Sequence, residues 1–200
     1  MAELGAVFDR IYRENAWAGE ESRSGPGSGR AATAWTAIAV RMMAVAVGAH
    51  TVVDMACGDG YWQPELPGYV GLDVSAEAIA RARELHPERT FRVFDPAIHR
   101  VPRGDLVLCR DAIHHLPAEE GHRLLGAIRA SGTPWLLATT YVGGELGLRI
   151  APGEAYSPDL EHPQWGLGPA LLLVRDGWDY EVGSHVRDAR KMLGLWHLGV

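Results

Sequence analysis

Apolar residues gather in short runs through the middle of this chain, and amphipathic or loop segments separate the runs. The runs lie at residues 51–56, 69–74, 89–95, 105–111 and 134–141. Most are apolar nearly throughout instead of alternating with polar residues, which is typical of strands buried on both faces. The pattern therefore predicts a parallel sheet covered by helices on each side.

Three segments show the spacing of helices. Residues 75–85 begin with Ser75, a favourable N-cap, and place apolar side chains at intervals of three and four. Residues 117–130 have a proline and acids in the first turn, as helix N-termini favour. Residues 31–47 predict a longer helix. Its expected apolar face consists of Trp35, Ile38, Ala39, Met42 and Ala46.

The pattern weakens after residue 141. Residues 170–176 and 191–198 look like two further strands, and most of 143–169 is typical of loops. We expect one open, doubly wound α/β sheet that is mostly parallel and has an antiparallel C-terminal strand.

Composition narrows the class of protein. The 200 residues are 47% hydrophobic and 22% charged, as in ordinary globular domains. A net charge of −6 argues against a broad nucleic-acid-binding surface, which needs clustered lysines and arginines. No signal peptide or membrane-spanning run is apparent. Cys57 and Cys109 stand far apart in apolar runs, so we expect reduced thiols in a cytoplasmic protein without a membrane partner.

Charged residues recur where the expected strands end. Asp54, Asp73 and Asp95 close the first three runs, and Arg110 with Asp111 closes the fourth. Ligands of open α/β sheets bind at this edge, beyond the carboxyl ends of the strands. A carboxylate at Asp73 can accept hydrogen bonds from both hydroxyls of a ribose. A nucleoside is therefore a candidate ligand.

The turn after the first strand supports a nucleoside that carries no phosphate. Gly58 and Gly60 allow a ligand to approach the backbone. Residues 61–68 contain two prolines where a phosphate-binding helix would begin, and the chain has no Gly-Lys-Ser/Thr of a P-loop.

Four stretches carry a resemblance to a known family. They are VVDMACGDG, YVGLDV, FRVFD and DLVLCRDAIHHLP, and they extend from residue 52 to residue 116. Together they resemble the class I S-adenosylmethionine-dependent methyltransferases. The resemblance implies a Rossmann-like sheet, S-adenosyl-L-methionine as cofactor and S-adenosyl-L-homocysteine as product. Ala56 departs from the family, which more often has glycine there, and its small side chain is expected to cost little.

The resemblance also implies which residues bind the cofactor. The methionine part would lie beside Asp54, the backbone of Ala56, Gly58 and Gly60, and the backbone carbonyl of Arg110. Asp73 would bind the ribose, Val74 and Pro96 would contact the adenine, and Asp95 would accept from the adenine amino group. Loop capping is the alternative role for Asp73 and Asp95, and a structural ion pair is the alternative for Arg110.

Residues 11–29 resemble the N-terminal arm of a subgroup of small bacterial methyltransferases, and KMLGLWHL at 191–198 resembles the end of that subgroup. The arm carries IYRENAWAGEESRSGPGSG, with serines and glycines that permit closure over a ligand. The residues expected to close the site are Tyr12, Trp17, Ser24, Gly25 and Ser28. Arg30 is expected to pair with the methionine carboxylate. A disordered connector is the alternative for this segment.

RDAIHHLP brings three candidate catalytic residues to the end of the fourth strand. A hydroxyl or amine acceptor must lose a proton during methyl transfer, and histidine has a suitable pKa for a base. We expect His115 to act as the base, with His114 as second candidate and Asp111 as orienting group. A structural role for the histidines stays open. No metal is expected, because a second well-spaced ligand is lacking.

The function predicted from these features is methyl transfer to a small molecule, on oxygen first and nitrogen second, in natural-product or sugar tailoring. We expect one domain over residues 1–200, with the arm at 1–30, the cofactor core at 31–142 and acceptor-side loops at 143–200. The aromatic residues of the irregular section between residues 141 and 178 form either an acceptor pocket or ordinary packing. They are Tyr141, Tyr156, His162, Trp165 and Trp178. A peptide acceptor and an inactive scaffold are the alternatives, and a homodimer is compatible with the apolar last strand.

Overall fold

A seven-stranded sheet forms the centre of the computed structural model, which describes residues 2–145, 150–177 and 190–199. The strands lie in the order β3-β2-β1-β4-β5-β7-β6. Their bounds are β1 (Val52–Met55), β2 (Val70–Asp73), β3 (Thr90–Val93), β4 (Leu106–Cys109), β5 (Trp135–Tyr141), β6 (Leu172–Arg175) and β7 (Lys191–His197). All seven predicted strands are therefore present, most with ends a residue or two inside the predicted ranges.

The C-terminal strand enters the sheet out of chain order. β1 to β5 pair in parallel, whereas β7 lies between β5 and β6 and runs antiparallel to both. The mostly parallel sheet with an antiparallel C-terminal strand is thus confirmed. The reversal has a local consequence: Lys191, the first residue of β7, pairs with Tyr141, the last residue of β5. Lys191 therefore lies at the edge where the parallel strands end.

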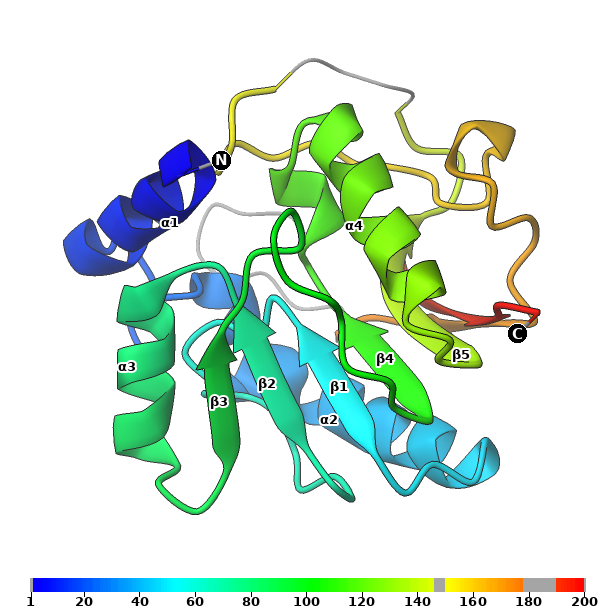
Figure 1. The fold of residues 1–200 in the computed structure, drawn as a ribbon, viewed down its shortest axis with the longest axis horizontal. Coiled ribbons are helices and arrows are strands. Elements are labelled where there is room, and N and C mark those ends of the chain that lie inside the picture. The colour runs from blue at the N-terminus through cyan, green and yellow to red at the C-terminus, as the bar shows by residue number, and fades with distance from the viewer. Residues whose placement is uncertain (1, 146–149, 178–189, 200) are drawn as a thin grey trace.

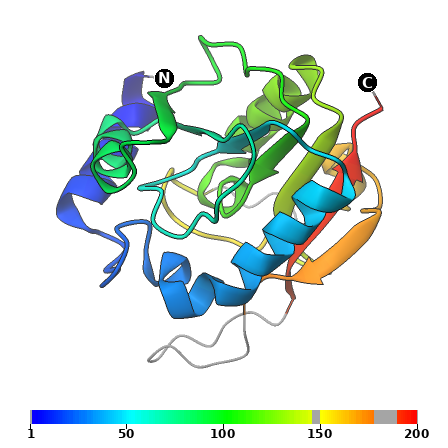
Figure 2. The same ribbon diagram turned by 90° about the horizontal axis from the view of Figure 1, so that it is seen from below.

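Helices cover both faces of this sheet. α4 (Ala118–Ala130) lies in front of it and α2 (Arg30–Ala46) behind it (Figure 1). Figure 2 shows α2 running along the face opposite α4. α3 (Ala76–Leu85) packs beside β2 and β3, and α1 (Ala2–Glu14) packs on α3. Ser75 caps α3 as predicted, since its hydroxyl accepts from the amide of Ala78 at 3.1 Å.

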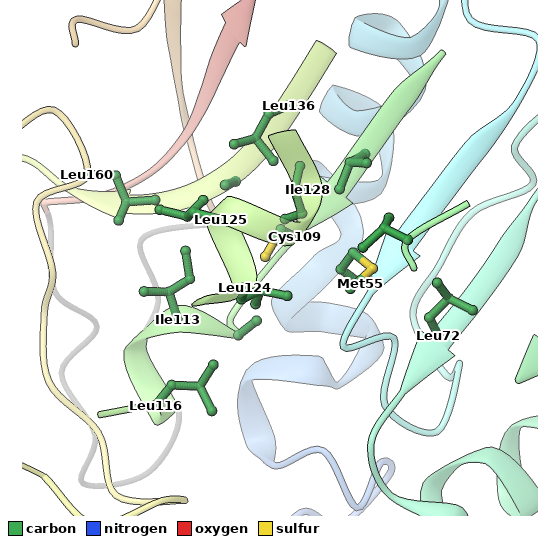
Figure 3. Close-up of a cluster of buried hydrophobic side chains, with 14 of the residues drawn as sticks. Met55, Leu72, Cys109, Ile113, Leu116, Leu124, Leu125, Ile128, Leu136 and Leu160 are labelled. Carbon is green, nitrogen blue, oxygen red and sulfur yellow. The ribbon is translucent and has the colours of Figure 1, made fainter. Parts of the chain in front are cut away.

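The largest core cluster fills the space between α4 and the sheet (Figure 3). Leu124, Leu125 and Ile128 of α4 are buried there, as their spacing predicts. They pack with Met55 of β1 and Leu72 of β2. Burying each such side chain contributes on the order of 1.5–3 kcal/mol. The cluster fixes α4 against the strand ends that carry the candidate site.

The predicted buried face of α2 is mostly wrong. Ala39 is buried as predicted, but Ile38 and Met42 are 50% and 58% exposed, and most of the side that meets the sheet lies outside the predicted face. The buried residues of α2 are Ala32, Thr33, Thr36, Ala39, Val40, Met43 and Ala44. Thr36 is fully buried because its hydroxyl donates to Asp176 at 2.7 Å. A helix face chosen by apolar character alone misses such a buried threonine.

The long segments without regular structure also follow the sequence in outline. Residues 56–69, between β1 and β2, contain no helix, as the two prolines predict. Between β5 and β6 the described residues form loops and the short 3-10 helix η3 (Pro163–Trp165). Tyr156 and Trp165 are buried in the core beneath these loops, which favours packing over an acceptor pocket. Trp178 lies outside the described residues.

Two smaller findings concern membranes and thiols. Among the helices that the structure describes, none is both long and apolar enough to cross a bilayer. Cys57 and Cys109 are buried free thiols. Burial raises the pKa of both, so they remain protonated at neutral pH.

Candidate functional site

A cavity of about 380 Å³ opens at the edge where the parallel strands end. This volume falls within the roughly 300–1,000 Å³ of small-molecule sites. Its walls come from the turns after β1 to β4, the N-terminal arm and the first residue of β7. The predicted site residues in these walls are Tyr12, Trp17, Ser24, Gly25, Ser28, Ala56, Gly58, Asp73, Val74, Pro96, Arg110, Asp111, His114 and His115.

The glycine turn after β1 packs directly against the N-terminal arm. Gly58 has a left-handed φ of +62°, and a Cβ there would collide with the hydroxyl oxygens of Ser24 and Tyr12. Only glycine fits this position. Ala56 also has a left-handed φ of +60°. Such a conformation costs a non-glycine residue about 1–2 kcal/mol, so the small side chain does not make this departure free.

Asp73, at the end of β2, faces the cavity from a firmly held position. Its carboxylate accepts from the amides of Gly58 and Ser75, each at 2.9 Å. Burial raises the pKa of Asp73 to about 6. The side chain therefore caps the loop and lines the cavity at once, so the two predicted roles are compatible in one geometry.

Asp54 lies behind the glycine turn and outside the walls of the cavity. Its Oδ2 accepts from the hydroxyl of Tyr69 at 2.7 Å and from Nε2 of Gln63 at 2.9 Å. Burial raises the pKa of Asp54 to about 7. The structure thus gives this carboxyl a supporting position beneath the turn.

Three further predicted cofactor residues lie outside the cavity walls. A Cβ at Gly60 would press on the ring of Phe91 at 3.1 Å, so this glycine permits close packing below the turn. Asp95 caps its own loop, accepting from the amide two residues ahead at 2.8 Å. Nε of Arg30 donates to the hydroxyl of Tyr61 at 3.2 Å. The structure does not bring these three residues into the cavity walls with the others.

The N-terminal arm is fastened to the glycine turn by Asp59. This carboxylate, only 1% exposed, accepts from the hydroxyl of Ser22 and the amide of Arg23, both at 2.8 Å, and from the hydroxyl of Ser24 at 3.2 Å. Ser24 is also 2.9 Å from the hydroxyl of Tyr12. Sequence reasoning missed Asp59, although an acid between two glycines is a usable signal.

Four charged side chains close a ring beside the cavity. Nε of Arg110 lies 3.0 Å from Oδ1 of Asp176, and Nη1 lies 3.2 Å from Oδ2 of Asp111. Nζ of Lys191 lies 2.7 Å from Asp111 and 3.0 Å from Asp176. We call Arg110, Asp111, Asp176 and Lys191 the charge ring. Its formal charges cancel, and the side chain of Arg110 takes the ion-pair role that was the alternative prediction.

The cations of the charge ring keep its carboxylates ionised. Burial by itself would raise their pKa values, but the facing charges of Arg110 and Lys191 outweigh it. The pKa of Asp111 therefore lies well below its ordinary range, and that of Asp176 is lowered as well.

Sequence reasoning missed Lys191 and Asp176. A signal existed for Lys191, because an antiparallel last strand must begin at the edge where the parallel strands end. Asp176 follows β6, which runs in the direction of β5, so it reaches the same edge. Trp62, whose ring lies 4.8 Å from the guanidinium of Arg110, was also missed, and nothing in its proline-containing loop marks it.

Asp111 has an unusual backbone conformation for its residue type. Its φ is +54°, and its amide donates to the hydroxyl of Thr139 at 2.9 Å. Left-handed residues other than glycine are concentrated at functional sites, where surrounding contacts hold them. Here the charge ring and Thr139 aim the carboxylate toward the cavity.

The two histidines of η2 (Ile113–His115) also line the cavity, and each is neutral near pH 7. Nδ1 of His115 lies 2.9 Å from the carbonyl of Glu154. Nδ1 of His114 lies 3.7 Å from Oδ1 of Asp111 and has no hydrogen-bond partner. Burial lowers the pKa of His115 and places that of His114 well below 6.5.

The histidines do not form part of a metal-ligand set in the described parts of the chain. Across residues 2–145, 150–177 and 190–199, no three His, Cys, Asp or Glu side chains group as metal ligands. The arrangement instead offers a carboxylate, two neutral imidazoles and a buried cation pair around one cavity.

Residues 52–134 match a family model described as a methyltransferase domain. The match spans the glycine turn, Asp73 and η2, so it includes the strand ends that form the cavity. The match and the strand order agree with the resemblance to class I S-adenosylmethionine-dependent methyltransferases that the sequence predicted. A comparison with curated protein sequences finds no significant match.

Solved structures with the same fold are distant in sequence. Magnesium protoporphyrin IX methyltransferase from Synechocystis PCC 6803, with bound S-adenosylmethionine, is 18% identical with a TM-score of 0.65, covering 97% of this chain and 94% of that one. A structure concerning conversion of a disulfide bond into a thioacetal group during echinomycin biosynthesis is 16% identical (TM-score 0.60; 97% and 92% covered). The 4+2 cyclase SpnF is 20% identical (TM-score 0.59; 82% and 70% covered). These likenesses show the fold.

Proposed function

We propose that the protein transfers a methyl group from S-adenosylmethionine to a small-molecule acceptor, with a hydroxyl preferred over an amine. The observation that carries this proposal is the cavity itself. The ribose-binding candidate Asp73 and the base candidate His115 line the same cavity. When bound, S-adenosylmethionine supplies an electrophilic methyl group on a sulfonium.

The residues in the cavity fit this cofactor. Gly58 and the carboxylate of Asp73 line the same part of the cavity, after β1 and at the end of β2. Val74 and Pro96 offer apolar contacts suited to adenine. Asp54 would act indirectly, by supporting the turn from behind. The adenine-binding role of Asp95 and the carboxylate-binding role of Arg30 have no support in this geometry.

His115 has the tautomer that a base requires. A carbonyl oxygen only accepts hydrogen bonds, so Nδ1 of His115 must carry the proton in its contact with Glu154. The neutral ring then keeps a free electron pair on Nε2, which can take the proton of an acceptor hydroxyl. Because burial lowers the pKa of His115, this neutral form persists at pH 7.

The charge around the acceptor end favours a neutral acceptor. The charge ring has no net formal charge, and both histidines are neutral. A neutral hydroxyl can donate to Asp111 or to His115 at this end of the cavity. Hydroxyl-bearing natural products and sugars meet this requirement. The structures related to porphyrin and echinomycin chemistry are consistent with small acceptors.

Two alternatives remain within the same fold. A peptide acceptor would need a groove along which an extended chain could lie, whereas arm residues line part of this cavity. A scaffold or a different reaction is represented by the 4+2 cyclase SpnF, which shares the fold. The neutral histidines and the ionised Asp111 lead us to prefer transfer, because a scaffold does not require such groups.

We predict that Asp73→Ala weakens S-adenosylhomocysteine binding at least about tenfold, since hydrogen bonds to a charged group contribute on the order of 1.5–3 kcal/mol. Asp73→Asn, which keeps the side-chain shape, should weaken it less. Isothermal titration calorimetry measures these affinities, with Glu84→Ala on the exposed side of α3 as control. Unchanged affinity in folded Asp73→Ala would refute the ribose assignment. Asp95→Ala in the same series distinguishes adenine binding from loop capping.

A further inference from the structure

The N-terminal arm contacts two distant ends of the cavity. Asp59 fastens its serines beside the glycine turn, and Trp17 stacks on His115, with ring centroids 4.6 Å apart and planes inclined by 23°. We propose that Trp17 is a positioning residue that makes closure of the arm over the cofactor and orientation of His115 a single event. This inference rests on the proposed function, in which His115 is the base.

Trp17 contacts the ring of His115 and also the backbone segment that holds this ring. Its Nε1 donates to the carbonyl of Gly153 at 3.2 Å. The amide of Gly153 donates to the carbonyl of His115 at 2.9 Å, and the next carbonyl, of Glu154, accepts from the ring of His115. The indole thus packs on the imidazole and also binds the segment that fixes its tautomer.

Neighbouring residues keep Trp17 in this position. Asn15 and Ala18 both have left-handed φ values, +51° and +53°. Non-glycine residues in this conformation persist only where the surrounding structure holds them, at a cost of about 1–3 kcal/mol each. Phe8 and Tyr12 of α1 pack edge-on against the indole. The turn after α1 therefore presents Trp17 to His115 in one defined geometry.

Closure of the arm changes the surroundings of His115. Besides Trp17, the groups around this ring are His114, Asp111, Lys191 and the backbone of Glu154. With the indole in place the ring is half-buried, and its desolvation disfavours the protonated form. An arm that covers His115 only when closed must therefore close less readily when His115 is protonated. By linkage, acid pH should weaken any ligand whose binding requires the closed arm.

The test is S-adenosylhomocysteine affinity at pH 5.5 and 7.5, measured by calorimetry. Asp73 contributes to the pH dependence in every variant, so the comparison is between variants. A histidine with an ordinary pKa near 6.5 is about 90% protonated at pH 5.5. The ratio of dissociation constants (pH 5.5 over 7.5) should therefore be up to about tenfold larger in the wild type than in His115→Gln.

Trp17 variants then decide the inference. Trp17→Ala should lower the ratio to that of His115→Gln, whereas Trp17→Phe, which keeps an aromatic ring, should preserve the wild-type ratio. Trp135→Phe, a tryptophan on β5 outside the cavity walls, is the matched control. Trp17→Leu replaces Trp17→Ala if the latter does not fold.

A wild-type ratio in folded Trp17→Ala or Trp17→Leu overturns the coupling and leaves the proposed function intact. Absence of binding by the wild type overturns both.

Discussion

Asp54 and Asp73 end adjacent strands, yet their carboxylates meet different surroundings. Asp73 faces the cavity and accepts from two backbone amides, whereas Asp54 accepts from Tyr69 and Gln63 behind the glycine turn. Burial raises the pKa of Asp54 to about 7, so its ionisation is unfavourable in the folded chain. This difference makes a prediction about stability.

Asp54→Asn should stabilise the protein more at pH 8 than at pH 5. An unfolded aspartate has a pKa near 3.9, so between about pH 4 and 7 the folded state holds a proton that the unfolded state has lost. The wild type therefore loses up to about 1.4 kcal/mol of stability per pH unit over this window. The amide of asparagine keeps an acceptor for Tyr69 and avoids that loss. Urea unfolding at both pH values measures the difference, and an equal difference at the two values would contradict the assignment.

Residue types alone could not separate these two aspartates. Both follow apolar residues near the ends of predicted strands, so the sequence predicts that both line the cofactor site. What separates them is Tyr69 and Gln63, which reach Asp54 from a loop with no regular pattern. His115 shows the opposite case, because its place directly after the fourth strand was enough to predict that it lines the site.

The N-terminal arm forms part of the cavity wall, and the side chain of Asp59 holds its serine-rich segment beside the glycine turn. Asp59 accepts three hydrogen bonds from Ser22, Arg23 and Ser24. No part of the sheet depends on these bonds. The arm should therefore detach while the rest of the fold remains.

Asp59→Ala should weaken S-adenosylhomocysteine binding about tenfold or more, because the arm loses charged hydrogen bonds of roughly 1.5–3 kcal/mol each. Amide hydrogen exchange should accelerate at residues 22–25 and not in β1 or β4. Asp105→Ala is the matched control, since Asp105 also accepts three hydrogen bonds, from His50 and Thr51 at the opposite end of β1. Asp105→Ala should reduce stability without changing affinity. An arm that stays protected in Asp59→Ala would contradict this account.

The positions of strands and helices were predicted better than the face that each helix buries. The five parallel strands and α4 follow from apolar runs and helical spacing, because burial on both sides of a sheet imposes those patterns. The face of α2 did not follow, since it includes the buried Thr36, whose hydrogen-bond partner Asp176 lies 140 positions away in the chain. Lys191 was missed for a related reason: its role depends on where β7 enters the sheet.

At the scale of the whole molecule, the sheet order brings distant residues to one edge. β7 lies next to β5, so Lys191 joins Arg110 and Asp111 from the far end of the chain. The order of strands beyond β5 was not predictable, because neither of the last two apolar runs carries a signal that it, and not the other, pairs with β5. The fold also leaves the reaction open, since a cyclase and methyltransferases share it.

Transfer of a labelled methyl group tests the central claim most directly. The purified protein is incubated with methyl-labelled S-adenosylmethionine and a cell extract of the organism that encodes it, and the products are separated by size. We predict label in the small-molecule fraction with the wild type, and at least about 100-fold slower labelling with His115→Gln at pH 7.5, as for loss of a general base. Label in macromolecules, or none despite cofactor binding, would contradict a small-molecule methyltransferase.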